Sequence, residues 1–158
     1  LQTLGIRNNQ LTSLDLSQNS QLTTLACEFN QINNLNTQNN PLLNFLYCNG
    51  NLISEFNFTN NPLLQYLVCG ANNITTLDVS NLNNLTTLNC SNSSNLTYIN
   101  MKNGSIENSS SLNFSLCPNL EFICCDDEQL TQVQNLITTY RKLSRKLFWL
   151  RLEIGFNT

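Results

Sequence analysis

Cysteine is the residue type with the most reactive chemistry in this chain, and its spacing is regular. Cys27, Cys48, Cys69 and Cys90 recur every 21 residues, each preceded by Leu-x. Thiolates in such numbers could bind a metal or form disulfides. However, the chain has no His and no Cys-x-x-Cys pair, and side chains one full repeat apart point the same way instead of facing each other. We therefore predict a column of small buried hydrophobic side chains, with no metal and no cofactor.

The cysteines mark one position of a longer repeat, L-x-x-L-x-C-x-x-N-x-L. Alternation around Leu25 and Cys27 predicts a short strand with these two side chains inward. Successive coils then place their strands side by side in a parallel sheet on the front face. The second half of each coil, such as Leu14-Asp-Leu16, also alternates and predicts an extended segment on the back. Half-coils begin 10 or 11 residues apart, at Leu1, Leu11, Leu22, Ile32, Leu43, Ile53, Leu64, Ile74 and Leu85.

Asparagine forms a second column in the repeat, at Asn9, Asn30, Asn51 and Asn72, with Ser93 in the next coil. Each turn between half-coils leaves buried backbone groups that need hydrogen-bond partners. An inward amide carries both a donor and an acceptor and can bridge adjacent coils. We therefore predict a stacked asparagine ladder.

The repeat loses its regularity after Leu96, and we expect a local distortion near residues 92–111. Strict alternation makes residues 96–105 a back segment, whereas their motif makes them a front strand, and the sequence leaves both open. The motif of 112–118 matches a back segment, and that of 121–125 matches a Cys-type front strand. The redox states of Cys117 and Cys124 are likewise open.

The sequence then changes to a helical pattern. Asp126, Asp127 and Glu128 suit a helix N-terminus, because acids favour its positive end. They could instead bind a cation, but helix capping explains them more simply. Apolar residues follow at helical spacing, at Leu130, Val133, Leu136, Ile137 and Tyr140. We predict a solenoid over residues 1–125 and a capping helix over 126–140.

Residues 141–158 form a divergent basic tail, predicted to be helical or disordered. Five of the seven Lys and Arg residues lie here. Drawn as a helix, the segment 140–152 is basic and amphipathic, a pattern also found in membrane-surface helices. We regard membrane contact as a minor alternative.

The repeat motif resembles that of bacterial cell-surface leucine-rich repeat proteins. The 21-residue cysteine-ladder repeats of the internalin J type are similar, as are Asn-rich repeat proteins of Bacteroidetes, and the resemblance covers residues 1–130. It implies a strand-rich leucine-rich repeat solenoid of the α/β horseshoe class. Short parallel strands would form the front, extended segments the back, and a helix the C-terminal cap. The resemblance also implies secretion or cell-surface attachment and adhesion or protein binding, without catalytic residues. Because Leu1 already lies inside a repeat, we expect the N-terminal cap and the export signal to lie outside this sequence.

Outward side chains of the front sheet are the candidate ligand contacts. Phe45, Tyr47 and Tyr66 are neighbours on adjacent predicted strands, and clustered exposed aromatic residues are typical of binding hot spots. The alternative is that aromatic residues simply favour strands. Further ligand-binding candidates on this face are Glu28, Arg7 and Phe29.

Composition excludes some functions. The chain has 158 residues, a formal charge of −3 and only 11% charged residues, and its acidic body is unsuited to nucleic acid. Without His, and with scattered acids, an enzyme is not expected. The leading hypothesis is a monomeric adhesion module that binds a protein or glycan. The alternatives are a structural spacer without its own ligand and, more remotely, an ice-binding protein with exposed Thr residues.

Overall fold

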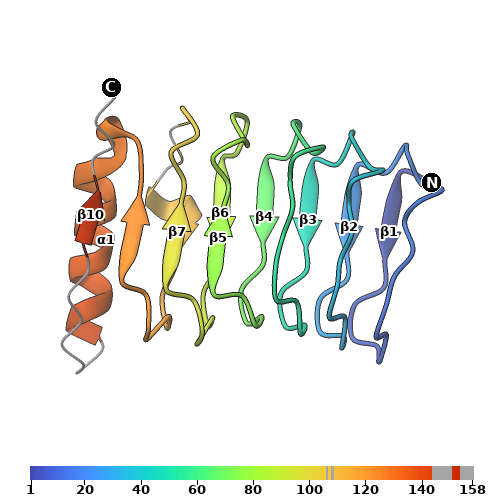
Figure 1. Ribbon diagram of the computed structural model, residues 1–158, viewed down its shortest axis with the longest axis horizontal. Coiled ribbons are helices and arrows are strands. Elements are labelled where there is room, and N and C mark those ends of the chain that lie inside the picture. The colour runs from blue at the N-terminus through green and yellow to red at the C-terminus, as the bar shows by residue number, and fades with distance from the viewer. Residues whose placement is uncertain (106, 108, 144–150, 154–158) are drawn as a thin grey trace.

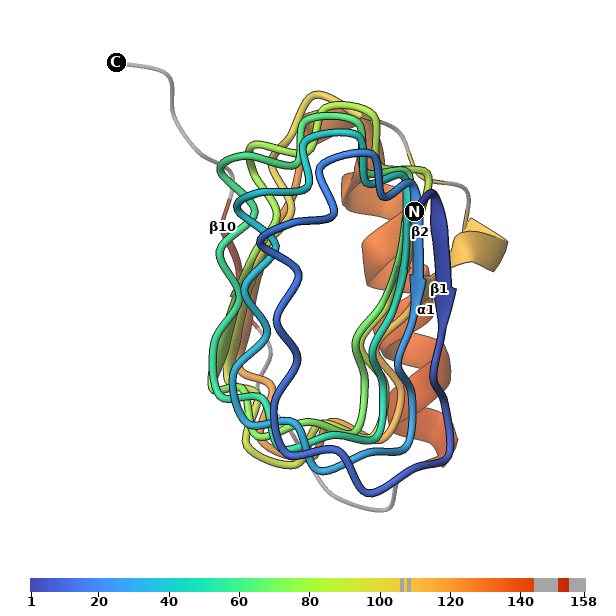
Figure 2. The same cartoon turned by 90° about the vertical axis from the view of Figure 1, so that its right-hand side faces the viewer.

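The computed structural model winds the chain into a solenoid whose coils stack along one axis, with the N-terminus at one end and a helix at the other (Figure 1). The structure describes residues 1–105, 107, 109–143 and 151–153. Viewed along the axis, each coil is a flattened loop with a front side, a back side and two turns (Figure 2). We call the turns that lead from back to front the upper edge and those that lead from front to back the lower edge.

The front side is a six-stranded parallel sheet, and every strand is three residues or shorter. Its inward leucines stack in register, Leu4 on Leu25, Leu25 on Leu46, and so on to Leu88 on Leu112. This confirms the predicted front sheet. Its strands are β1 (Thr3–Gly5), β2 (Thr24–Ala26), β3 (Phe45–Tyr47), β4 (Tyr66–Val68), β6 (Thr87–Asn89) and β8 (Leu112–Asn113).

The back side is extended chain in the early coils and becomes a sheet in the later ones. Its order is β10-β9-β7-β5, and all pairs are parallel. The strands are β5 (Thr76–Asp78), β7 (Tyr98–Asn100), β9 (Phe122–Cys124) and β10 (Arg151–Glu153).

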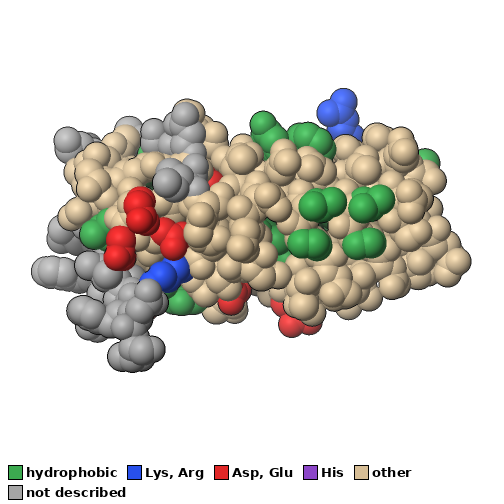
Figure 3. All heavy atoms as spheres, turned by 90° about the horizontal axis from the view of Figure 1, so that it is seen from above, with side chains coloured by type: hydrophobic (Ala, Val, Ile, Leu, Met, Phe, Trp, Pro, Cys, Tyr) green, Lys and Arg blue, Asp and Glu red, His purple; other side chains and the backbone are tan. Residues whose placement is uncertain are grey.

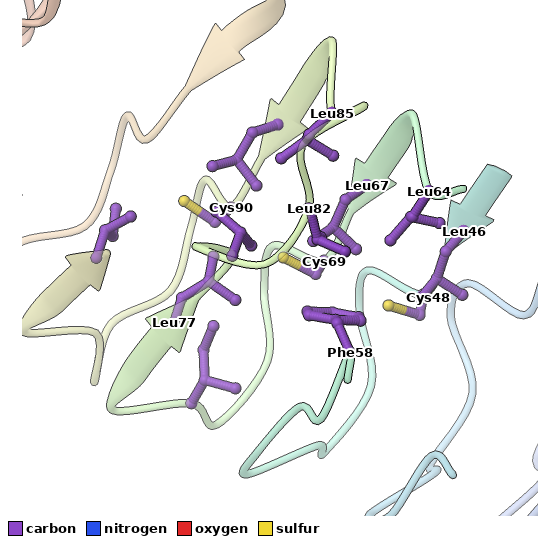
Figure 4. Packing of buried hydrophobic residues seen from close by; sticks show 14 of the residues in the cluster. Leu46, Cys48, Phe58, Leu64, Leu67, Cys69, Leu77, Leu82, Leu85 and Cys90 are labelled. Atoms are coloured by element: carbon purple, nitrogen blue, oxygen red, sulfur yellow. The ribbon is translucent and has the colours of Figure 1, made fainter. Parts of the chain in front are cut away.

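The core lies between the two sides, and in the four middle coils the front contributes one leucine and one cysteine each. Leu46 and Cys48, like Leu67 and Cys69, are fully buried and point into the coil (Figure 4). Phe58 reaches them from the back. Burying such side chains contributes about 1.5–3 kcal/mol each, so the inward column, repeated in each coil, drives the stacking.

The later coils decide whether residues 96–105 lie on the front or on the back. They are on the back, because β7 pairs with β5 and β9. The motif-based predictions for the next two segments were wrong. Residues 112–118 supply the front strand β8, and residues 121–125 supply the back strand β9. Each half-coil must continue the backbone hydrogen bonds of the same side of the preceding coil, and this requirement outweighs the similarity of side-chain motifs.

The predicted distortion is an insertion. Leu67 pairs with Leu88, an offset of 21 residues, whereas Leu88 pairs with Leu112, an offset of 24. The additional residues lie before β8, where Ser109–Ser111 form the 3-10 helix η1.

A helix covers the end of the last coil. The 3-10 helix η2 (Asp127–Gln129) leads into α1 (Leu130–Leu143), in which Val133 and Ile137 are buried. The helix begins later and ends later than the predicted residues 126–140. No helix in the described part of the chain is long and apolar enough to cross a membrane.

The basic tail is only partly described. Residues 141–143 continue α1, and Arg151–Glu153 form β10 beside β9, where helix or disorder was predicted. The predicted amphipathic helix over 140–152 falls largely outside the described residues.

Candidate functional site

The lower edge is held by the asparagine ladder. The amide of Asn51 donates to the carbonyls of Cys27 and Cys48 at 3.0 and 3.1 Å, and its Oδ1 accepts the N–H of Ile32 at 3.0 Å. Asn30 and Asn72 repeat these bonds in their own coils. Each buried amide therefore ties its coil to the preceding one.

The two ends of this ladder differ from its middle. Asn9 is exposed and bonds only within its own coil, to the carbonyls of Ile6 and Arg7. Ser93 is fully buried, and its hydroxyl has no hydrogen-bond partner among the described residues. In the next coil Cys117 stands where the asparagine would be, and its thiol donates to the Cys90 carbonyl at 3.3 Å.

A second amide ladder, which sequence reasoning missed, supports the upper edge. Asn61 is fully buried and donates to the carbonyls of Thr37 and Asn40 at 3.0 Å, while the Thr37 hydroxyl donates to Asn61 Oδ1 at 2.7 Å. Asn40 donates likewise to the preceding coil, but its Oδ1 has no partner because Leu16 stands where Thr37 would be. The Asn-Pro dipeptide that recurs at residues 40–41 and 61–62 was the available sequence signal.

The four cysteines of the column, Cys27, Cys48, Cys69 and Cys90, lie in surroundings that disfavour thiolate chemistry. All four are free thiols. Burial raises the pKa of Cys27 to about 12, and burial raises the pKa values of Cys48, Cys69 and Cys90 well above the ordinary value. Because the thiolate is the reactive form, these groups serve packing. No group of three or more His, Cys, Asp or Glu side chains that could hold a metal occurs among the described residues.

The front face brings the three predicted aromatic residues together. Phe45 and Tyr66 stack across β3 and β4 with ring centroids 4.9 Å apart and planes 27° apart. Tyr47 is half-buried on the same face of β3, beside Val68 of β4. Phe45 and Tyr66 therefore turn one ring face toward each other.

The other candidates lie to one side of this group. Phe29 is 56% exposed, and its ring lies against Gly50 of the next coil, where an added Cβ would approach Phe29 Cδ1 to 2.6 Å. Glu28 is half-buried, and its buried Oε2 has no hydrogen-bond partner in the part of the chain that the structure describes. Arg7 is exposed in the first coil, two coils away from Tyr47. The structure therefore does not bring Arg7 into the aromatic group.

Phe29 also has an unusual backbone. One residue in each coil has a positive φ at this place, and these residues are Asn8, Phe29, Gly50, Ala71, Asn92 and Leu116. Glycine and asparagine adopt this conformation at low cost, whereas a bulky side chain is strained there. Phe29 and Leu116 are the bulky residues in this column, and both are exposed.

The upper edge adds apolar residues that sequence reasoning missed. Leu42 and Leu63 are 37% and 44% exposed, and Pro41 and Pro62 before them are exposed as well. Seen from above, apolar side chains form one compact group on this edge (Figure 3). We call the combined surface the apolar band, and it consists of Pro41, Leu42, Phe45, Tyr47, Pro62, Leu63, Tyr66 and Val68.

The apolar band is confined to two coils. At the places of Leu42 and Leu63 the flanking coils carry Gln21 and Asn84. At the places of Phe45 and Tyr66 they carry threonine. A comparison of equivalent positions between coils could have revealed the apolar band from the sequence.

A buried polar cluster joins the last back turn to the cap, and sequence reasoning missed it too. Glu107 is fully buried and accepts hydrogen bonds from the amides of Asn103 and Gln129. Burial raises the pKa of Glu107, and the nearby Asp126 carboxylate adds to this effect. Asp126 precedes η2 without capping it, so the capping explanation was wrong for this residue. Its carboxylate accepts instead from the turn at Gly104.

Comparison with known proteins supports the fold. No protein-family model and no curated protein matches the chain. A solved structure, the functional domain of InlJ from Listeria monocytogenes, which includes a cysteine ladder, is 33% identical over 80% of this chain, with a TM-score of 0.60. A leucine-rich repeat protein of Leptospira interrogans is 22% identical over 98% of the chain, with a TM-score of 0.61, and shows the fold alone.

The chain spans 25% and 37% of the lengths of these two structures. Both neighbours are leucine-rich repeat proteins, a class of typically non-enzymatic modules that bind proteins. The 21-residue spacing, the buried cysteine column and the asparagine rungs are all present here. The chain is therefore a leucine-rich repeat protein with a cysteine ladder of the InlJ type.

Proposed function

We propose that this chain is the binding module of a secreted or cell-surface adhesion protein, and that the apolar band contacts its ligand. The observation that carries the proposal is that Leu42, Leu63, Phe45 and Tyr66 lie in two adjacent coils, whereas the flanking coils carry Gln21, Asn84 or threonine at the same places. Packing does not require apolar residues there, because the flanking coils stack in the same register. Exposed apolar groups cost solubility and are typical of interaction sites.

The ring geometry favours a protein ligand over a glycan. A sugar binds aromatic residues by lying on an open ring face, whereas Phe45 and Tyr66 stack on each other across the two strands. Their edges, the apolar edge residues and the Tyr66 hydroxyl instead suit a packed protein interface with a polar rim. Threonine and asparagine on the flanking strands supply that rim.

The charge distribution indicates the kind of surface that fits. The apolar band contains no charged side chain, and the two charged candidates on this face, Glu28 and Arg7, lie toward its N-terminal side. A neutral, apolar patch on the partner would therefore fit.

An array of extracellular proteins and glycans tests the proposal. The variant Phe45→Thr/Tyr66→Thr copies the threonine of the flanking coils and keeps the strand propensity. We expect it to lose a protein hit by at least tenfold while its thermal midpoint changes little. Thr3→Val, on the same row of the sheet but in the first coil, is the matched control and should bind like the wild type.

The outcomes separate the alternatives. A protein hit that the double variant retains would disprove the assignment of the apolar band. A hit confined to glycans would make this a lectin-like site. Binding to nothing on the array would support the spacer function, which the amide ladders between the coils also suit.

A further inference from the structure

The turn after β7 contains one of the two Asn-Gly pairs of the chain, Asn103-Gly104. Asn103 is buried, whereas Gly104 is exposed and has a φ of 70°. Without a Cβ, the glycine leaves its backbone nitrogen sterically accessible. That nitrogen can attack the side-chain amide carbon of the preceding asparagine and close a five-membered succinimide ring.

Three groups contact the atoms that such a reaction changes. Asp126 Oδ2 accepts a hydrogen bond from the N–H of Gly104 at 2.9 Å, so a base contacts the nitrogen that would attack. Glu107 Oε1 accepts a hydrogen bond from Asn103 Nδ2 at 3.1 Å, so a carboxyl group contacts the nitrogen that would leave. The N–H of Ser105 donates to Asn103 Oδ1 at 2.9 Å, where negative charge would develop.

We propose that Asn103-Gly104 is a self-modifying site, at which the protein catalyses its own conversion of Asn103 to aspartate and isoaspartate. Asp126 takes the proton of the Gly104 N–H, and the nitrogen forms a bond to Asn103 Cγ. The Ser105 N–H stabilises the oxyanion. Glu107 gives its proton to the amide nitrogen, the Cγ–Nδ2 bond breaks, and ammonia leaves.

Water completes the reaction without any oxidant or cofactor. It enters at the exposed Gly104 and opens the succinimide at either carbonyl. The proton on Asp126 returns to Glu107 through solvent, so both carboxyl groups are restored. The net change replaces one amide nitrogen by oxygen.

Glu107 is suited to the acid role by its surroundings. It is fully buried, and both burial and the neighbouring Asp126 raise its pKa, so its protonated form persists to higher pH than that of an ordinary glutamate. Asp126 accepts hydrogen bonds from two backbone N–H groups, those of Asn103 and Gly104, so its carboxyl oxygen contacts the nitrogen that would attack.

The chain contains its own matched control. Asn49-Gly50 is the second Asn-Gly pair, and Gly50 also has a positive φ, of 68°. However, the N–H of Gly50 donates to the backbone carbonyl of Gly70 at 3.0 Å. A carbonyl is not a base, and this bond holds the nucleophile without activating it.

The experiment is timed peptide mapping of the purified full chain after incubation at neutral pH, folded and in concentrated urea. A positioned acid or base contributes typically about 10²–10⁴-fold, so we expect Asn103 to convert at least tenfold faster than Asn49 in the folded chain. In urea the two rates should become equal, because both pairs then have the same neighbour. Glu107→Gln should slow conversion at Asn103 and leave Asn49 unchanged.

The wild-type comparison decides the question even if that variant folds poorly. Equal conversion, or slower conversion at Asn103 than at Asn49 in the folded chain, overturns the proposal. The hydrogen bonds of Asp126 and Glu107 would then only fix the turn against the cap.

Discussion

Replacing Asn51 by alanine tests whether the asparagine ladder holds the coils together. The amide carries three hydrogen bonds at the centre of the solenoid. The carbonyls of Cys27 and Cys48 each keep a second amide partner, from Asn30 and Asn72. The N–H of Ile32, however, has Asn51 Oδ1 as its partner, and Ile32 is fully buried.

The expected loss of stability follows from the N–H of Ile32, which loses its hydrogen-bond partner. A buried donor without a partner costs about 1–3 kcal/mol, and the carbonyls add less because they stay bonded. Asn51→Ala should therefore lower the free energy of unfolding by about 2–3 kcal/mol. The matched control is Asn9→Ala, since Asn9 is exposed and water can replace its bonds. We expect less than about 0.5 kcal/mol there.

Urea unfolding followed by circular dichroism measures both variants. The midpoints should differ clearly, at similar slopes, if the chain unfolds as one cooperative unit. A midpoint for Asn51→Ala that equals the midpoint for Asn9→Ala would refute the reasoning. The ladder would then be a consequence of stacking and not one of its causes.

Three further changes probe the upper edge, the cap and the front face. Thr37→Val should orphan Asn61 Oδ1 and cost about 1–3 kcal/mol in urea unfolding; no loss would show that the hydroxyl is dispensable. Glu107 binds a proton more tightly when folded, so its contribution to stability falls as pH rises from the ordinary glutamate pKa through the raised folded pKa. Glu107→Gln should flatten this dependence in thermal melts across that range, and an unchanged slope would contradict it. Gly70→Ala should cost about 1–3 kcal/mol by overpacking, because the new Cβ would lie 2.2 Å from a backbone carbonyl oxygen of the next coil. Gly5→Ala, with nothing within 4 Å, is its control, and equal midpoints would count against the clash.

Much of the candidate site was predictable because it repeats. A period of 21 residues places equivalent side chains in columns, so Phe45 and Tyr66 had to be neighbours once the strands stacked. The contacts within the turns were harder to predict from the sequence. Thr37 and Asn61 bond across 24 residues. The alternation of Leu35 and Thr37 predicts that Thr37 points inward, but the local sequence does not show that the Asn61 amide meets it. Glu107 lies in the irregular insertion, where periodicity offers no guide.

The sequence by itself determined the coil. Leucine and cysteine at alternate positions need burial, asparagine after the strand satisfies the turn, and the constant spacing forces parallel stacking. The tertiary structure alone decided which side each late segment takes. Residues 112–118 look like a back segment and 121–125 like a front strand, yet each lies on the other side. Backbone hydrogen bonds must continue from coil to coil, and leaving a buried ladder unpaired costs more than placing Phe114 where a cysteine would fit.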